Sequence, residues 1–130
     1  MIRVLVIDDD PFILRMVDRM LASPEYVLTL AQSGPEGFEA YRQGLHDIVI
    51  TDVAMPVHQG LQMIGELRAL EPSLPILVIS GGGWLFNGAE LLTIASQAGA
   101  TEILGKPFTS QQLTDAISHC LLSAKLRTRI

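Results

Sequence analysis

Residues 4–11, with the sequence VLVIDDDP, decide the fold class of this chain. The first half of the stretch is a run of large aliphatic residues, which is typical of a strand buried on both faces. The second half ends the strand, because aspartate and proline favour turns. An aspartate N-cap with proline in the first turn then predicts a helix. A buried strand that passes directly into a helix is the repeating unit of parallel sheets.

The same alternation continues along the rest of the chain. Further short apolar runs predict strands at residues 27–31, 48–51, 75–79 and 101–104. Helical patterns follow each strand, including one over residues 91–98, and capping boxes are expected at Ser33 with Glu36 and at Thr109 with Gln112. Because strand–helix–strand connections are right-handed, we predict a doubly wound α/β fold with a five-stranded parallel sheet and five helices.

Composition limits the class of protein. The chain has 130 residues, 48% hydrophobic and 18% charged, which suits one domain with a substantial core. Its apolar runs are far shorter than the roughly 20 residues that cross a bilayer, and it starts without a secretory signal pattern. A single cysteine, Cys120, allows no internal disulfide. We therefore expect a cytoplasmic protein with no membrane insertion.

Charge and chain organisation give two further expectations. The net charge of −5 disfavours direct nucleic-acid binding, which usually requires a basic surface. The one basic cluster is at the C-terminal end, where we interpret it as a solvated helix end favoured by the helix dipole. We expect a single domain at residues 1–124, followed by a short tail at residues 125–130.

Polar side chains follow four of the five predicted strands. Asp8 and Asp9 come after the first strand, Asp52 after the third, Ser80 after the fourth and Lys106 after the fifth. In an open parallel sheet, ligands bind at the carboxyl ends of the strands. We therefore expect these side chains to meet at one edge of the sheet, although each of them alone would be an ordinary turn or loop residue.

The residue types in this group suit phosphoryl transfer. Carboxylates that lie close together repel one another, and Mg²⁺ with oxygen ligands is the usual remedy. A lysine supplies a point charge for a phosphoryl oxygen, and a serine hydroxyl can donate to another. A carboxylate can itself be the nucleophile and form an aspartyl phosphate. Asp10 is interpreted differently, as the N-cap of the first helix.

Beyond these residue types, the chain resembles the receiver domain of bacterial response regulators, which has a flavodoxin-like fold. The resemblance extends over nearly the whole chain, in the order and at the spacing of the family. It rests on segments 4–11, 47–52, 55–56, 60, 75–81, 98–100 and 105–108, which read VLVIDDDP, DIVITD, MP, G, PILVISG, AGA and GKPF.

The resemblance implies a role in two-component signalling rather than an enzyme activity on a separate substrate. Asp52 would accept a phosphoryl group from a phosphohistidine on a sensor histidine kinase or a histidine phosphotransfer protein. Ser80 would hydrogen-bond that group, and Lys106 would pair first with Asp52 and then with a phosphoryl oxygen. The peptide bond between Lys106 and Pro107 is expected to be cis. A downstream effector protein would then read the altered surface.

The resemblance also implies the ligands of the metal. Asp9 and Asp52 would bind Mg²⁺ directly, Asp8 would contribute through water, and the backbone carbonyl of Ala54 would be a further ligand.

The chain departs from the family pattern at several positions. Ile103 replaces the usual tyrosine or phenylalanine and cannot make the rotation attributed to that aromatic residue. We expect the apolar loop at residues 84–86 to carry the readout instead, unless it simply packs on the sheet edge. Ala54 is smaller than the polar residue often found there, and His58 is interpreted as an exposed loop residue.

Three other classes of protein are considered. A phosphohydrolase of the haloacid dehalogenase type would need a second aspartate at position 54, where this chain has alanine. A flavodoxin-like cofactor carrier would need a phosphate-binding loop after the first strand. A pseudo-receiver that no longer accepts phosphate is opposed by the presence of all four site groups.

Overall fold

A five-stranded parallel sheet forms the centre of the molecule, which we describe from a computed structural model at residues 1–52, 57–80, 97 and 99–128. The strands are β1 (Ile2–Ile7), β2 (Tyr26–Ala31), β3 (Ile48–Asp52), β4 (Ile76–Ser80) and β5 (Glu102–Gly105). The helices are α1 (Pro11–Met20), α2 (Gly34–Gln43), α3 (Val57–Leu70) and α5 (Ser110–Thr128). The strand order is β2-β1-β3-β4-β5, which confirms the predicted parallel sheet.

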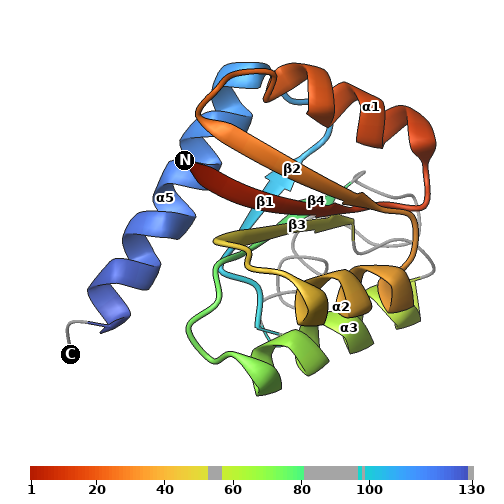
Figure 1. Ribbon diagram of the computed structural model, residues 1–130, viewed down its shortest axis with the longest axis vertical. Helices are drawn as coiled ribbons and strands as arrows, with labels where there is room; N and C mark the ends of the chain where they lie inside the picture. Colours follow the sequence, from red (N-terminus) through yellow and green to blue (C-terminus); the bar gives the residue numbers. More distant parts are fainter. Residues whose placement is uncertain (53–56, 81–96, 98, 129–130) are drawn as a thin grey trace.

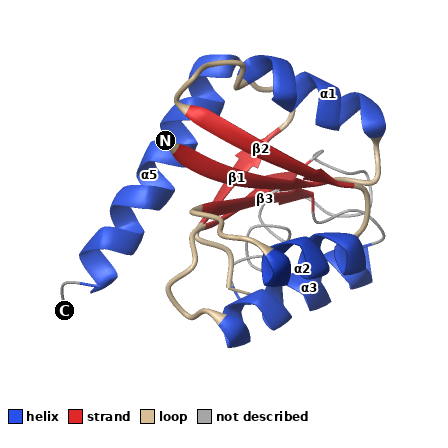
Figure 2. Ribbon diagram, viewed as in Figure 1, coloured by secondary structure: helices blue, strands red, loops and turns tan. Residues whose placement is uncertain are grey.

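Both faces of the sheet are covered, as the aliphatic runs predict. Alternate side chains of the central strands belong to two separate apolar clusters, with Val6 in one and Leu5 in the other. Helices α1 and α5 cover the first face, and α2 and α3 cover the second (Figure 1; Figure 2). This is the doubly wound arrangement. Four of the five predicted helices belong to the described residues, whereas the helix predicted over residues 91–98 lies outside them except at residue 97.

Local capping explains where several helices begin. The Asp10 carboxylate accepts a hydrogen bond from the backbone N–H of Phe12 at 2.9 Å, so Asp10 is the N-cap of α1 as predicted. Ser33 caps α2 by accepting from the N–H of Glu36 at 3.2 Å. In the last helix the cap is reciprocal, since Thr109 and Gln112 each accept a hydrogen bond from the other's backbone N–H. Helix α5 then continues to Thr128, past the boundary expected at residue 124.

His46 lies in the connection between α2 and β3, where it is partly buried. Its ring stacks on Tyr41 with centroids 6.0 Å apart, and its Nε2 lies 3.4 Å from the Thr29 hydroxyl. The buried Nδ1 has no hydrogen-bond partner among the described residues. Burial, followed by the nearby Arg3 guanidinium, lowers the pKa of His46, while Asp47 acts in the opposite direction.

This environment predicts a pH dependence of stability. Because the pKa of His46 is lower in the folded protein than in the unfolded chain, His46 favours folding above its ordinary pKa of about 6.5. That contribution is lost as the pH falls through the lower folded pKa. His46→Gln should therefore lose less stability than the wild type between pH 7.5 and 5.5. Urea unfolding of both proteins at each pH measures this difference, and equal losses would contradict it.

Candidate functional site

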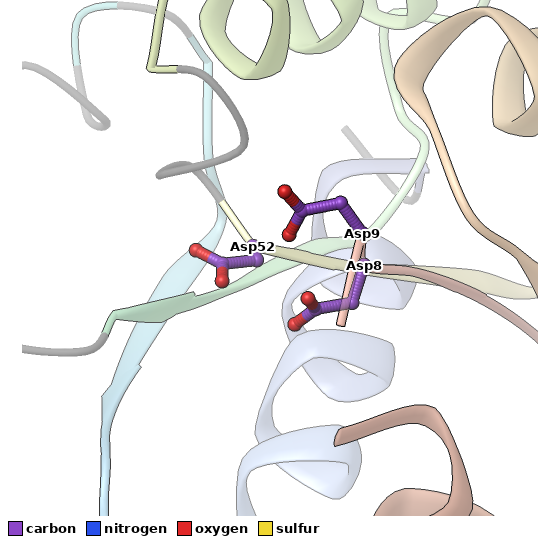
Figure 3. A group of neighbouring side chains, drawn as sticks. All are labelled: Asp8, Asp9 and Asp52. Carbon is purple, nitrogen blue, oxygen red and sulfur yellow. The ribbon is translucent and has the colours of Figure 1, made fainter. Parts of the chain in front are cut away.

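The candidate site lies at the carboxyl edge of the sheet, where the strand directions bring its residues together. Asp8 follows β1, Asp52 ends β3, Ser80 ends β4, and Lys106 follows β5. Figure 3 shows Asp8 and Asp9 at the end of β1, with Asp52 beside them. The predicted convergence is confirmed for the positions of these residues, which follow or end parallel strands at the carboxyl edge of the sheet.

The three aspartates form a compact acidic group. One carboxylate oxygen from each of Asp8, Asp9 and Asp52 lies within 4.8 Å of the other two. Asp8 is only 1% exposed and Asp52 only 7% exposed, while Asp9 is open to solvent. Since like charges at this separation repel strongly in a partly buried site, the group is suited to a cation with oxygen ligands.

Lys106 supplies part of the compensating charge. Its Nζ lies 3.1 Å from Asp52 Oδ2, within hydrogen-bond distance, and 3.8 Å from Asp8 Oδ2. Its backbone N–H donates to the carbonyl oxygen of Ser80 at 2.7 Å, which joins the loop after β5 to the end of β4. The peptide bond from Lys106 to Pro107 is cis, as the resemblance implies. Lys106 therefore faces both of the buried carboxylates.

Lys106 alone does not satisfy the buried carboxylate of Asp8. Its Oδ1 accepts a hydrogen bond from the Asp10 backbone N–H at 2.9 Å, whereas its buried Oδ2 accepts none from the described residues. Burial raises the pKa of Asp8 to about 6, although the Asp10 N–H and Lys106 act in the opposite direction. The Asp52 and Asp9 carboxylates also contribute to this increase. A buried carboxylate oxygen without a donor, beside two more carboxylates, fits a hard divalent cation.

Some of the residues singled out in the sequence lie elsewhere. Ile103 is partly buried and contacts the apolar cluster on the α2 and α3 face of the sheet. Ala54 and the apolar loop at 84–86 lie outside the described residues, so the expectations placed on them stay predictions. The backbone of His58 lies in α3, which begins at Val57, so the loop predicted at His58 is wrong, while its side chain is not described.

One buried polar residue was not anticipated. Among the described residues the buried polar or charged side chains are Asp8, Thr51, Asp52 and Ser80. Three of these were singled out from the sequence, and the fourth is Thr51. The signal that could have revealed it is a hydroxyl residue inside an otherwise aliphatic strand, directly before Asp52.

The fold and the acidic site define a class of protein, and comparison with known proteins identifies the same class. Residues 4–118 match the response regulator receiver domain family, so the chain belongs to that family. It is a receiver domain of the kind found in the response regulators of two-component systems. Within the described residues, no helix has the length and apolar character needed to cross a membrane.

Relatives and solved structures give particular comparisons. The chain is 30% identical over 117 residues to the transcriptional regulatory protein GlrR of Escherichia coli, covering 90% of this chain and 26% of GlrR. It is 33% identical over 112 residues to the response regulator MprA of a Mycobacterium species, covering 86% of this chain and 47% of MprA. The chain therefore spans about a quarter to a half of the length of these relatives.

A receiver domain protein of Clostridium thermocellum has a solved structure of similar size. It aligns with a TM-score of 0.84 at 30% identity, covering 97% of this chain and 98% of that one.

Proposed function

We propose that Asp52 is the phosphoacceptor of this receiver domain. The observation that carries the proposal is the position of Lys106 Nζ, 3.1 Å from Asp52 Oδ2, beside the carboxylates of Asp8 and Asp9. Phosphoryl transfer depends mainly on positioning and on neutralising charge. A nucleophilic carboxylate with an ammonium group at hydrogen-bond distance and a cation-binding group beside it meets both needs.

The acidic group is proposed to hold Mg²⁺. Asp9 and Asp52 would be direct ligands, Asp8 would contribute through water, and the Ala54 carbonyl would be a further ligand. The bound ion would neutralise charge on the phosphoryl oxygens. The fit rests on the all-oxygen donor set of the three aspartates and on the buried Asp8 Oδ2, which accepts no hydrogen bond from the described residues.

The residues of the chain divide the chemistry between them. An Asp52 carboxylate oxygen attacks phosphorus, the new P–O bond forms, and the P–N bond to the donor histidine breaks. The leaving imidazole takes the bonding electron pair. Lys106 then leaves its ion pair with Asp52 and pairs with a phosphoryl oxygen, and the Ser80 hydroxyl donates a hydrogen bond to a second phosphoryl oxygen. The added phosphoryl group carries a charge of about −1.5 to −2. It can produce a signal only through contacts that differ between the phosphorylated and unphosphorylated states of the domain.

The partners follow from this chemistry. The donor is proposed to be a phosphohistidine on a sensor histidine kinase or a histidine phosphotransfer protein, and the reader a downstream effector protein in the cytoplasm. The chain itself assists only its own phosphorylation and dephosphorylation. We also keep as proposals a helix over residues 91–98, the domain at 1–124 with a tail at 125–130, and the absence of direct nucleic-acid binding.

A prediction about Asp8 follows from its raised pKa. The pKa of Asp8 is about 6 in the folded protein and is lower in the unfolded chain. When no cation is bound, the free energy of unfolding therefore falls as the pH rises through about 6 and Asp8 becomes ionised in the folded state. Asp8→Asn should therefore raise the metal-free melting temperature by a few degrees at pH 7.5 and weaken Mg²⁺ binding at least about tenfold, since a metal-site partner is lost. Calorimetric melting with EDTA and Mg²⁺ titration measure the two effects. A lower melting temperature, or Mg²⁺ affinity like that of the wild type, would contradict the prediction.

The proposed function is tested with the wild-type protein. Incubation with acetyl phosphate and Mg²⁺ should add one phosphoryl group to the intact mass, and EDTA should prevent the addition. Binding of beryllium fluoride, a phosphoryl mimic, provides a second measurement. If neither an adduct nor beryllium fluoride binding is observed, the domain is a pseudo-receiver and the proposal is wrong.

A further inference from the structure

Thr51 is a buried hydroxyl residue in a row of aliphatic side chains. The register of the sheet places Ile7, Thr51 and Val78 at the same level on β1, β3 and β4, and Ile103 continues the row on β5. Ile7, Val78 and Ile103 belong to or contact the apolar cluster that α2 and α3 cover, and Thr51 is 0% exposed.

Packing alone does not account for a hydroxyl at this position. Valine has nearly the shape of threonine and would complete the row of β-branched aliphatic residues. A hydroxyl that is removed from water costs free energy unless it forms a hydrogen bond. Here the Thr51 Oγ1 donates to the backbone carbonyl oxygen of Asp52 at 3.3 Å.

The acceptor of this hydrogen bond is at a position that matters for the reaction. The carbonyl oxygen of Asp52 is part of the peptide plane that follows this proposed phosphoacceptor, so its position depends on the orientation of that plane. The backbone torsions of a residue limit which side-chain rotamers it can adopt. A donor that holds this peptide plane therefore restricts the directions in which the Asp52 carboxylate can project toward Lys106 and the acidic group.

We propose that Thr51 is a positioning residue for Asp52, which it orients through the backbone rather than by contact with the phosphoryl group. This inference rests on the proposed function, because the reaction it serves is phosphorylation of Asp52. The hydroxyl reduces the conformational freedom of the nucleophile before the phosphoryl donor binds. Such preorganisation is a recognised cause of rate enhancement.

The test compares two replacements of Thr51 with a matched replacement elsewhere. Thr51→Val removes the hydroxyl and keeps the shape, while Thr51→Ser keeps the hydroxyl. Thr101→Val is the control, because the Thr101 hydroxyl accepts a hydrogen bond from the Ile76 N–H at 3.0 Å at the opposite edge of the sheet. Each protein is assayed for its rate of phosphorylation by acetyl phosphate at saturating Mg²⁺, and for its unfolding by urea.

Thr51→Val should be phosphorylated about five- to tenfold more slowly, the scale expected for loss of one orienting hydrogen bond. Thr51→Ser should recover most of the rate, and Thr101→Val should keep the wild-type rate even if it is less stable. The carbonyl ¹³C resonance of Asp52 should shift in Thr51→Val and stay near its wild-type position in Thr51→Ser.

Two results would overturn the assignment. A wild-type rate and an unchanged Asp52 carbonyl resonance in Thr51→Val, with only stability reduced, would make Thr51 a packing residue. A wild-type protein that forms no adduct would overturn the proposed function, and the role of Thr51 in that reaction with it. The two failures are distinguishable because the first requires that the wild type be phosphorylated.

Discussion

Asp52→Asn should abolish the phosphoryl adduct completely, while leaving the fold intact. Asparagine is close to aspartate in size, but its amide cannot act as the nucleophile that forms an aspartyl phosphate. The variant also removes one of the three carboxylates that lie within 4.8 Å of one another, so their mutual repulsion falls. The expected result is no mass increase with acetyl phosphate and Mg²⁺ over a period in which the wild type is fully modified.

Asp10→Asn is the matched control for this variant. It makes the same chemical change two residues from Asp8, but the Asp10 carboxylate caps α1 and lies outside the acidic group. Asparagine is as good an N-cap as aspartate, so this protein should fold and be phosphorylated like the wild type. An adduct that persists in Asp52→Asn would show that another residue accepts the phosphoryl group.

Gly37→Ala should destabilise the domain by about 1–2 kcal/mol, although alanine normally stabilises a helix interior by about 0.5–1 kcal/mol relative to glycine. Gly37 is in α2, where the helix lies directly against β1. A Cβ atom at this position would overlap Ile7 Cδ1 and lie 2.6 Å from Ile7 Cγ1. Ile7 is 0% exposed, so its side chain has little room to move away, and overpacking of this kind typically costs about 1–3 kcal/mol.

Gly65→Ala is the control, because Gly65 lies within α3 and a Cβ there meets nothing within 4 Å. That variant should stabilise the domain by about 0.5–1 kcal/mol. The double variant Gly37→Ala with Ile7→Val should be less destabilised than the sum of the two single changes, since valine lacks the Cδ1 atom. Urea unfolding of the four variants and the wild type gives the free energies, and stabilisation by Gly37→Ala would contradict the close contact.

Much of the fold is determined locally. The aliphatic residues of β1 and the Asp10-Pro11 start of α1 are neighbours in sequence, so pattern and capping rules are sufficient to predict them. The same is true of the Ser33 and Thr109 caps. The direction of the strands then brings Asp8, Asp52 and Lys106 to one edge, because parallel strands share their carboxyl ends. The sequence by itself therefore determined the fold class and the placement of these residues at one edge of the sheet.

Other properties depend on which distant segments approach, and only the tertiary structure decided them. The raised pKa of Asp8 requires that β1 be covered on both faces and that Asp52 come from β3. The overlap expected at Gly37 exists because α2 lies against Ile7, thirty positions earlier in the chain. Thr51 reads as one more strand residue until the register places it between Ile7 and Val78. Burial and close contact depend on neighbours that are far apart in sequence. Local patterns therefore predict the position of a residue but not the environment around its side chain.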